Sequence, residues 1–256
     1  TSVTEQWAVM SLSGPNAPAL MAELTEADMD PERFGFMAWK EAEVLGVPGR
    51  VFRISFTGEA NSYEINVPAR YGLSVWREIV ARGQRHGLTP YGTEAMHLLR
   101  AEKGFVIVGQ DTDGTVTPHD LRMSWGVSAK KPDFVGKRSL DRADTARKDR
   151  RQLVGLLTDD PGFVPMEGAQ VIAEEAESSG PTPMLGHVTS AYRSPNLNRS
   201  IALALIDDGT TRMGGTVYVS VRGEAPRPAR ICETDFLALR DSGALDAAHT
   251  LPEAAE

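Results

Sequence analysis

The sequence has 256 residues, of which 41% are hydrophobic and 24% charged, as in an ordinary globular protein with a sizeable core. Its net charge of −8 argues against a broad nucleic-acid-binding surface, because such a surface needs a basic face to neutralise phosphates. The single cysteine, Cys232, excludes a disulfide framework, and no apolar run approaches the roughly 18 residues that cross a membrane. The first residues have no signal-peptide or transit-peptide character. We therefore expect a cytoplasmic protein that binds neither nucleic acid nor membranes.

The first half of the chain alternates predicted strands and helices. Residues 6–14 indicate a strand, and Pro15 and Asn16 begin a helix. Two further strands are predicted on either side of a turn at Val47–Pro48–Gly49, and the segment YEINV forms the next. Apolar residues at helical spacing predict a helix over 72–85, followed by another in TEAMHLLRAEK. This mixture predicts an α+β fold.

The pattern changes after the charged run DRADTARKDRR, residues 141–151, which is predicted to be a solvated helix or a linker. Six short β-like segments follow, separated by Gly, Pro, Asp and Asn, and they predict a small β-barrel or sandwich. We therefore divide the chain into an α+β domain at 1–142, a β domain at 143–240 and a loose tail at 241–256.

Most catalytic motifs are absent from the sequence. It has no dinucleotide-binding glycine motif, no P-loop, no HExxH and no nucleophile elbow, and its five histidines lie at no metal-ligand spacing. The segment 111–114, DTDG, lacks the glutamate that completes a calcium loop, so it is predicted to be a turn and no metal site is expected. Glu64 is unexplained: it lies in the middle of a strand in which Tyr63, Ile65 and Val67 alternate as one face. Judged by residue type alone, it is a solvent-facing side chain.

Several segments resemble the glycine-cleavage T-protein (aminomethyltransferase) superfamily in order and spacing. They are RISFTGEANSYEINVPA, LLRAEKGFVIVGQDTDGTVTPHDLRMSWGV, KPDFVGKRSL and GHVTSAYRSPNLNRSIALALI. Within the superfamily, TSVTEQWAVMSLSGPNA and PYGTEAMHLLRAEKGF are most similar to the C-terminal part of the alpha subunits of heterotetrameric sarcosine oxidases. The resemblance spans about residues 2 to 237. It implies a partial folate-binding domain, without its amino-terminal part, followed by a C-terminal β-barrel.

The resemblance also assigns roles to residues. The family's strand glutamate, which matches Glu64, binds the pterin of tetrahydrofolate; a carboxylate has two acceptor oxygens for the pterin's two parallel donors. Phe56 matches an aromatic position beside the pterin, although a core position is an equal alternative. Tyr63 is expected to point into the core and support the site. Arg53 either meets the glutamate tail of folate or pairs with Glu59, and the pairing is favoured. The expected cofactor-binding residues are thus Glu64, Phe56, Tyr63 and Arg53.

Two departures from the family pattern bear on the reaction. Met96 stands where T-proteins carry an arginine that helps to hold folate, which favours the oxidase branch over a strict aminomethyltransferase. The family's catalytic aspartate lies upstream of the segment that matches Thr1, so no catalytic residue is expected in this chain. The loop from Gly109 to Pro118 is expected to close over the site.

The resemblance implies a role in oxidative N-demethylation. The chain would be the folate-site portion of a sarcosine oxidase alpha subunit, which transfers the carbon released from sarcosine to tetrahydrofolate and gives 5,10-methylenetetrahydrofolate. FAD, FMN and NAD are expected elsewhere in the complex, and the isolated chain is expected to be inactive. The expected partners are the beta, gamma and delta subunits and the amino-terminal part of alpha. The alternatives are a subunit-assembly module of an N-methyl amine oxidase, or a trimmed aminomethyltransferase or demethylase.

Overall fold

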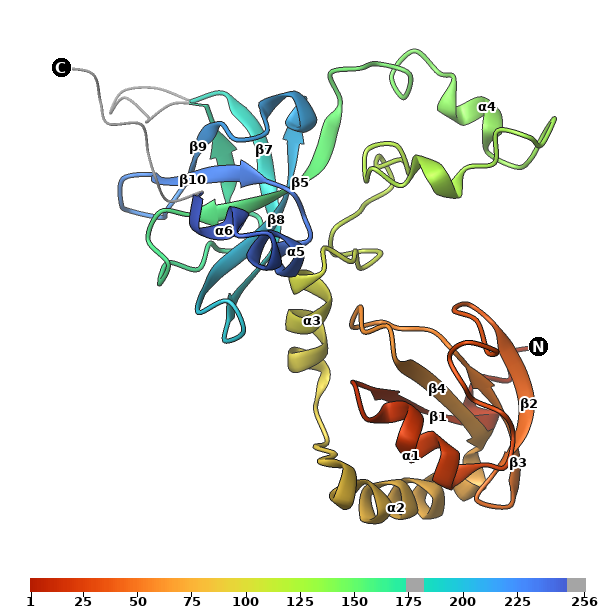
Figure 1. The fold of residues 1–256 in the computed structure, drawn as a ribbon. Coiled ribbons are helices and arrows are strands. Elements are labelled where there is room, and N and C mark those ends of the chain that lie inside the picture. Colours follow the sequence, from red (N-terminus) through yellow and green to blue (C-terminus); the bar gives the residue numbers. More distant parts are fainter. Residues whose placement is uncertain (174–181, 248–256) are drawn as a thin grey trace. The chain divides into compact units, whose positions relative to one another are not determined.

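The computed structural model describes residues 1–173 and 182–247 of the chain (Figure 1). Contacts within the chain define two compact units, residues 1–97 and residues 98–256, and each unit is described separately below. The predicted division after residue 142 falls inside the second unit, because residues 98–142 group with the barrel that follows them.

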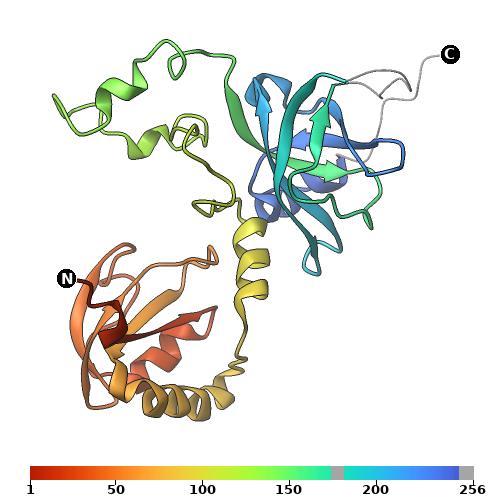
Figure 2. The same ribbon diagram turned by 180° about the vertical axis from the view of Figure 1, so that it is seen from behind.

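The first unit contains an antiparallel sheet with the strand order β1-β4-β3-β2 (Figures 1 and 2). The predicted strands and helices of this half are confirmed, with different bounds. The strands are β1 (Trp7–Ser13), β2 (Trp39–Val44), β3 (Val47–Phe52) and β4 (Ser62–Pro68). The helices are α1 (Ala17–Leu24) and α2 (Gly72–Gly83), with 3₁₀ turns η1 (Thr4–Gln6), η2 (Ala69–Tyr71) and η3 (Gln84–His86). Helix α3 (Thr93–Glu102) begins in the first unit and ends in the second.

The core of the first unit lies on one face of this sheet. Alternate residues of β4, namely Tyr63, Ile65 and Val67, are buried against apolar side chains of α1 and α2. Because successive side chains of a strand point to opposite faces, Glu64 and Asn66 lie on the other face of the sheet. The period-2 pattern of YEINV thus fixes the face on which Glu64 lies.

The hairpin between β2 and β3 differs from the sequence prediction. Its turn is at Leu45 and Gly46, which both have positive φ angles (54° and 75°), and Val44 pairs with Val47 across it. The prediction of a turn at Val47–Pro48–Gly49 is therefore wrong. These residues belong to β3, and Gly49 is required there because a Cβ atom would lie 2.5 Å from the carbonyl oxygen of Asn66.

The second unit contains a closed barrel with the strand order β10-β5-β8-β7-β6-β9. The barrel confirms the predicted series of six β segments. Its strands are β5 (Arg151–Thr158), β6 (Gln170–Ile172), β7 (Met184–Ser194), β8 (Arg199–Asp207), β9 (Thr216–Val219) and β10 (Arg227–Cys232). The unit also contains α4 (Lys137–Leu140), α5 (Phe236–Asp241), α6 (Ala244–Ala247), η4 (Ser124–Gly126) and η5 (Gly209–Arg212). Residues 141–150 form turns and bends, so the charged run before the barrel is a linker and not a helix.

Strands β5 and β8 are buried on both faces. One face of each strand fills the barrel, and the other packs against Phe236 of α5 and Ala101 near the end of α3. Burial on both faces explains why the sequences QLVGLLT and SIALALI are continuous apolar runs rather than alternating patterns. Leu245, in the segment predicted to be a loose tail, is buried in α6; residues 248–256 of that tail lie outside the described part.

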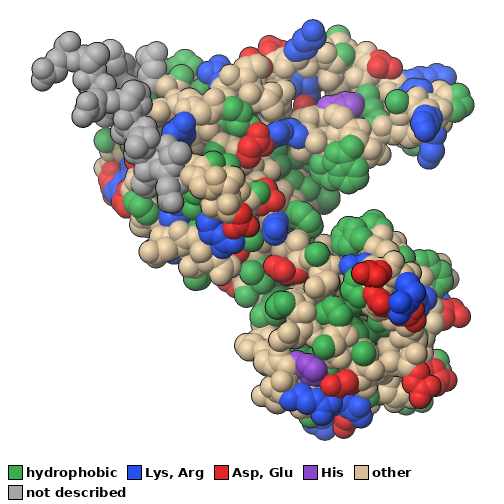
Figure 3. Space-filling model, viewed as in Figure 1, with side chains coloured by type: hydrophobic (Ala, Val, Ile, Leu, Met, Phe, Trp, Pro, Cys, Tyr) green, Lys and Arg blue, Asp and Glu red, His purple; other side chains and the backbone are tan. Residues whose placement is uncertain are grey.

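The surfaces of both units carry acidic and basic side chains that are interspersed on the face drawn in Figure 3. None of the helices in the described residues is both long and apolar enough to span a bilayer.

Candidate functional site

Glu64 lies in the middle of a row of side chains that crosses the sheet of the first unit. In this antiparallel register, Glu64 of β4 is paired with Ser11 of β1 on one side and with Phe52 of β3 on the other. Directly paired residues of neighbouring strands point to the same face, so the Glu64 carboxylate stands between a hydroxyl and an aromatic ring. Its backbone is held on both sides by the sheet, which keeps the direction of the side chain constant.

The carboxylate of Glu64 has no hydrogen bond or ion pair with any residue in the described part of the chain. The side chain is partly buried, and this burial raises the pKa of the Glu64 carboxyl. An unpaired carboxylate that is partly removed from water disfavours its own charged form. Glu64 is therefore neither a freely solvated glutamate nor a partner in a structural ion pair, and a donor from a ligand would compensate its charge.

A pocket of about 200 Å³ opens in front of Glu64. We call it the Glu64 pocket. Apart from Glu64, its wall includes the side chains of Ser11, Ser13, Phe56 and Tyr91. Polar groups and aromatic rings thus line the same small hollow, a combination typical of small-molecule sites.

Phe56 and Tyr63, the two aromatic residues predicted for the site, have different environments. Phe56 is 49% exposed and lies in the wall of the pocket, which excludes the alternative that it is a core aromatic. Tyr63 points into the core as predicted, with 1% exposure, and its hydroxyl donates a 3.0 Å hydrogen bond to the carbonyl oxygen of Met29. The Phe56 ring is therefore accessible to a ligand, whereas the buried Tyr63 ring supports the strand that carries Glu64.

Arg53 binds the backbone rather than an acidic side chain. Its Nη1 donates hydrogen bonds to the carbonyl oxygens of Pro31 and Phe34, at 2.6 and 2.7 Å. The favoured pairing of Arg53 with Glu59 is wrong, since no such ion pair forms among residues 1–173 and 182–247. Arg53 fastens the segment before β2 onto the sheet, and its predicted contact with a folate tail stays a prediction.

A larger cavity of about 560 Å³ adjoins the Glu64 pocket along β1, one of the two edge strands of the sheet. We call it the β1 cavity. The two hollows share Ser11, Ser13, Tyr91 and Met96 in their walls. Met96, which was expected to replace an arginine of the family, therefore lies at the border of the two hollows. Ser11 and Ser13 were not among the residues predicted for the site, although they alternate with Leu12 along β1 and lie on the same face as Glu64.

The loop from Gly109 to Pro118 is anchored in the second unit by a buried charge that the sequence analysis did not identify. Asp111, predicted to lie in a turn, is fully buried and pairs with the fully buried Arg100 of α3. The same carboxylate accepts hydrogen bonds from Ser190 and Thr189 of β7 and from the backbone N–H of Ile107. That this loop closes over the folate site stays a prediction.

No group of three or more His, Cys, Asp or Glu side chains in the described ranges is placed so as to hold a metal ion. The candidate site of this chain is built from Glu64, Phe56, Ser11 and Ser13.

The sequence matches two consecutive family models, the GCVT N-terminal domain over residues 1–131 and the glycine cleavage T-protein C-terminal barrel domain over residues 151–237. A sarcosine oxidase alpha subunit from Corynebacterium sp. (strain P-1) is 49% identical over 227 residues. An aminomethyltransferase from Moorella thermoacetica is 34% identical over 236 residues. The first match covers 88% of this chain but 23% of the alpha subunit, and the second covers 92% and 61%.

The fold has a counterpart among solved structures. The crystal structure of glycine cleavage system aminomethyltransferase T from Bartonella henselae is similar, with a TM-score of 0.74 and 21% sequence identity. The match covers 90% of this chain and 59% of the Bartonella chain. The shared fold agrees with the two consecutive sequence matches, which together reach from residue 1 to residue 237. The chain belongs to the glycine cleavage T-protein family.

Proposed function

We propose that this chain forms the folate site of a sarcosine oxidase alpha subunit. The site would receive the carbon that is released when an N-methyl amine such as sarcosine is oxidised, and would transfer it to tetrahydrofolate. The 49% identity to a sarcosine oxidase alpha subunit, against 34% to an aminomethyltransferase, favours the oxidase branch of the family.

The observation that carries this proposal is the unpaired carboxylate of Glu64 in its pocket. A reduced pterin presents an exocyclic amine and a neighbouring ring N–H, which are two parallel donors for the two oxygens of one carboxylate. Partial burial makes such charge-assisted hydrogen bonds stronger than they would be in water. The residues present therefore fit a pterin: Glu64 would accept its donor edge, and Phe56 would pack against its ring.

The adjoining β1 cavity supports the proposal through its size. The Glu64 pocket alone, at about 200 Å³, is smaller than the roughly 300–1,000 Å³ of typical ligand pockets, whereas the adjoining cavity adds about 560 Å³. The cavity wall includes Trp76, Ile79 and Leu88, which are suitable neighbours for the aromatic middle part of a folate. A ligand anchored at Glu64 would thus extend along β1.

The division of labour in the complete enzyme follows from the chemistry. Oxidation of an N-methyl amine removes a hydride and leaves an imine, whose carbon is lost as formaldehyde in water. Tetrahydrofolate, when bound, supplies two neighbouring nitrogens that capture this carbon. The residues of this chain hold and orient the pterin and limit the access of water. Flavin and NAD would bind elsewhere, and the beta, gamma and delta subunits and the rest of alpha would be the partners.

Isothermal titration of the complete complex with folinate, a stable reduced folate, tests the site. Replacing Glu64 by Gln removes the charge and one acceptor, so the affinity is expected to fall by about 1.5–3 kcal/mol, or roughly 10- to 150-fold. Glu41→Gln is the matched control, because Glu41 is an exposed glutamate on β2 of the same sheet and lines neither hollow.

Equal folinate affinity in the wild type and in Glu64→Gln would contradict the proposal. That result would favour the alternative in which this face of the sheet serves mainly for the assembly of subunits.

A further inference from the structure

A second hollow, of about 360 Å³, lies in the second unit, away from the residues assigned to folate. Its walls come from the loop after α3, from the charged linker and from strands β5, β7 and β8 of the barrel. We call it the Arg151 hollow. The side chains that matter for its chemistry are Asp113, Asp144, Arg147, Arg151, His187 and Asp207.

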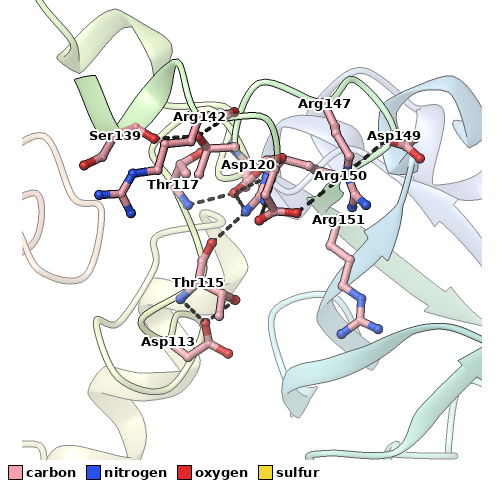
Figure 4. A network of polar contacts seen from close by, with 12 residues as sticks. Asp113, Thr115, Thr117, Asp120, Ser139, Arg142, Arg147, Asp149, Arg150 and Arg151 are labelled. Atoms are coloured by element: carbon pink, nitrogen blue, oxygen red, sulfur yellow. Dashed lines mark hydrogen bonds and ion pairs between the residues drawn. The ribbon is translucent and has the colours of Figure 1, made fainter. Parts of the chain in front are cut away.

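Arg150, the last residue of the charged linker, has its hydrogen-bond donors occupied by groups of the protein. Its guanidinium donates to both oxygens of Asp120, with the shortest contact at 2.7 Å, and also to Asp144 and to the carbonyl oxygen of Thr115 (Figure 4). Asp120 in turn accepts a 2.7 Å hydrogen bond from the backbone N–H of Thr117. Arg150 and Asp120 are both nearly buried, so this pair anchors the linker and has no capacity for a ligand.

Arg151, the next residue, is used only in part. Its Nε donates to Asp207 at 3.2 Å, and its two terminal amino groups make no hydrogen bond with any residue that the structure describes. In Figure 4 the Arg151 side chain extends away from the contacts of Arg150. The unused amino groups leave a planar set of donors of the kind that binds a carboxylate through two parallel hydrogen bonds.

Asp113 and His187 provide complementary groups in the same hollow. Thr115 donates twice to Oδ1 of Asp113, at 2.7 Å each, which lowers the pKa of the Asp113 carboxyl and leaves Oδ2 able to accept. The imidazole of His187 has no hydrogen-bond partner among the described residues. Burial and the nearby Arg151 lower the pKa of His187, so at neutral pH the ring is uncharged.

The charges of the lining decide which ligand suits the hollow. Four carboxylates and three guanidiniums line it, a net charge of −1 with His187 neutral, so a simple anion would enter a slightly negative site. A simple cation would meet the unused donors of Arg151. A molecule that carries both charges satisfies both ends.

We propose that the Arg151 hollow binds a small zwitterion, an amino acid or an N-methylated amino acid, with its carboxylate on Arg151 and its ammonium on Asp113. His187 then lies beside the ligand as a neutral hydrogen-bonding group. The proposal does not depend on the folate site, because none of these residues lines the Glu64 pocket or the β1 cavity.

The experiment uses NMR of the full chain, with the imidazole nitrogens of His187 as reporter. Glycine, sarcosine, β-alanine and γ-aminobutyrate are titrated as zwitterions of increasing charge separation, and acetate, phosphate and methylammonium as singly charged references. At least one zwitterion is expected to shift the His187 signals saturably, with a Kd in the millimolar range and at least tenfold below that of each reference. The zwitterion that binds best reports the distance between the two charged partners.

Two variants locate the site, and one serves as control. Arg151→Gln and Asp113→Asn are each expected to weaken the best zwitterion at least tenfold. Arg122→Gln is the control, because Arg122 lies in the same unit, pairs with Glu233 at the surface and does not line the hollow. The absence of a saturable shift would overturn the proposal. It would also be overturned if acetate, phosphate or methylammonium bound as tightly as the best zwitterion.

Discussion

Glu64 combines two properties that a stable surface residue avoids, a full charge and partial burial without a partner. A structural glutamate would gain stability from an ion pair or from solvation, and this one has neither in full. Residues that lower the stability of the folded state to keep a reactive or binding group available are typical of functional sites. The residue proposed to bind folate should therefore be a weak point in the stability of the free protein.

This expectation can be tested by the pH dependence of thermal unfolding. Burial raises the pKa of the Glu64 carboxyl above its value in the unfolded chain. The folded state then holds this proton more tightly, so the contribution of Glu64 to stability is favourable at low pH and is lost as the pH rises through the folded pKa. Without ligand, Glu64→Gln is expected to have a higher Tm than the wild type at pH 7 to 8.

The difference in Tm between the two proteins is expected to shrink toward zero as the pH is lowered through the titration of Glu64, because both side chains are then neutral. Glu41→Gln, on the exposed edge strand β2, should follow the wild type throughout. A difference in Tm that is independent of pH would show that the charge of Glu64 has no part in it.

At the residue scale, sequence reasoning found charges that follow a local pattern and missed those that depend on tertiary contacts. Glu64 could be placed on the face opposite the core because Tyr63, Ile65 and Val67 alternate with it along the strand. The pairing of Arg53 with Glu59 was wrong because two carbonyl groups, from residues about 20 positions earlier in the chain, satisfy the arginine instead. Asp111 lies in a turn as predicted, but its buried contacts were missed because its hydrogen-bond partner Ser190 on β7 is 79 positions away.

At the scale of elements, helix α3 is fastened at its carboxyl end by buried polar side chains. Arg100 donates to the carbonyl oxygen of Phe105 at 2.9 Å and to the hydroxyl of Ser190 at 2.8 Å, in addition to its pair with Asp111. Glu102, also fully buried, accepts a 2.6 Å hydrogen bond from the hydroxyl of Ser194. A solvent-exposed helix end would gain little from such residues, so their role is to hold the helix end in the second unit.

The Arg100–Asp111 pair gives a prediction about the stability of the second unit. Asp111→Asn keeps the shape of the side chain but leaves the buried guanidinium of Arg100 uncompensated, so the free energy of unfolding in urea is expected to fall by about 3–5 kcal/mol. Glu233→Gln is the control, because it removes the exposed pair with Arg122 and should cost at most about 1 kcal/mol. Equal losses in the two variants would contradict the interpretation of Arg100–Asp111 as a buried anchor.

The boundaries of elements show the same limit as the residues. Helix α2 could be predicted because its apolar positions repeat at helical spacing, and Gly87, with a φ of 75°, ends the 3₁₀ turn η3 that follows the helix. The hairpin turn was placed wrongly because Pro48 and Gly49 are common in turns, whereas here Gly49 makes room for the backbone of β4. A Pro-Gly pair in the sequence is compatible with a turn or with a close approach of two strands. Only the pairing register of the strands shows which of the two applies.

At the scale of the molecule, the barrel was predictable and the compact units were not. The six short apolar segments between turn residues indicated a β domain, and their closure into a barrel followed from the family resemblance. The contact boundary at residues 97 and 98 lies inside helix α3, where the sequence is a continuous helical pattern. The charged linker at 141–150 lies between the two domains matched by the family models. The boundary between the compact units, at residues 97 and 98, lies elsewhere.

The proposed function makes its last prediction for the complete enzyme, through the fate of the carbon released from sarcosine. If Glu64 holds the pterin, Glu64→Gln lowers the capture of this carbon. At subsaturating folate and equal peroxide production, the ratio of methylenetetrahydrofolate to free formaldehyde should therefore fall about tenfold or more. The two products are quantified together after sarcosine turnover by the assembled complex, with Glu41→Gln expected to keep the wild-type ratio. An unchanged ratio in Glu64→Gln would mean that capture takes place at another site, because Glu64 is the only carboxylate that lines the Glu64 pocket among residues 1–173 and 182–247.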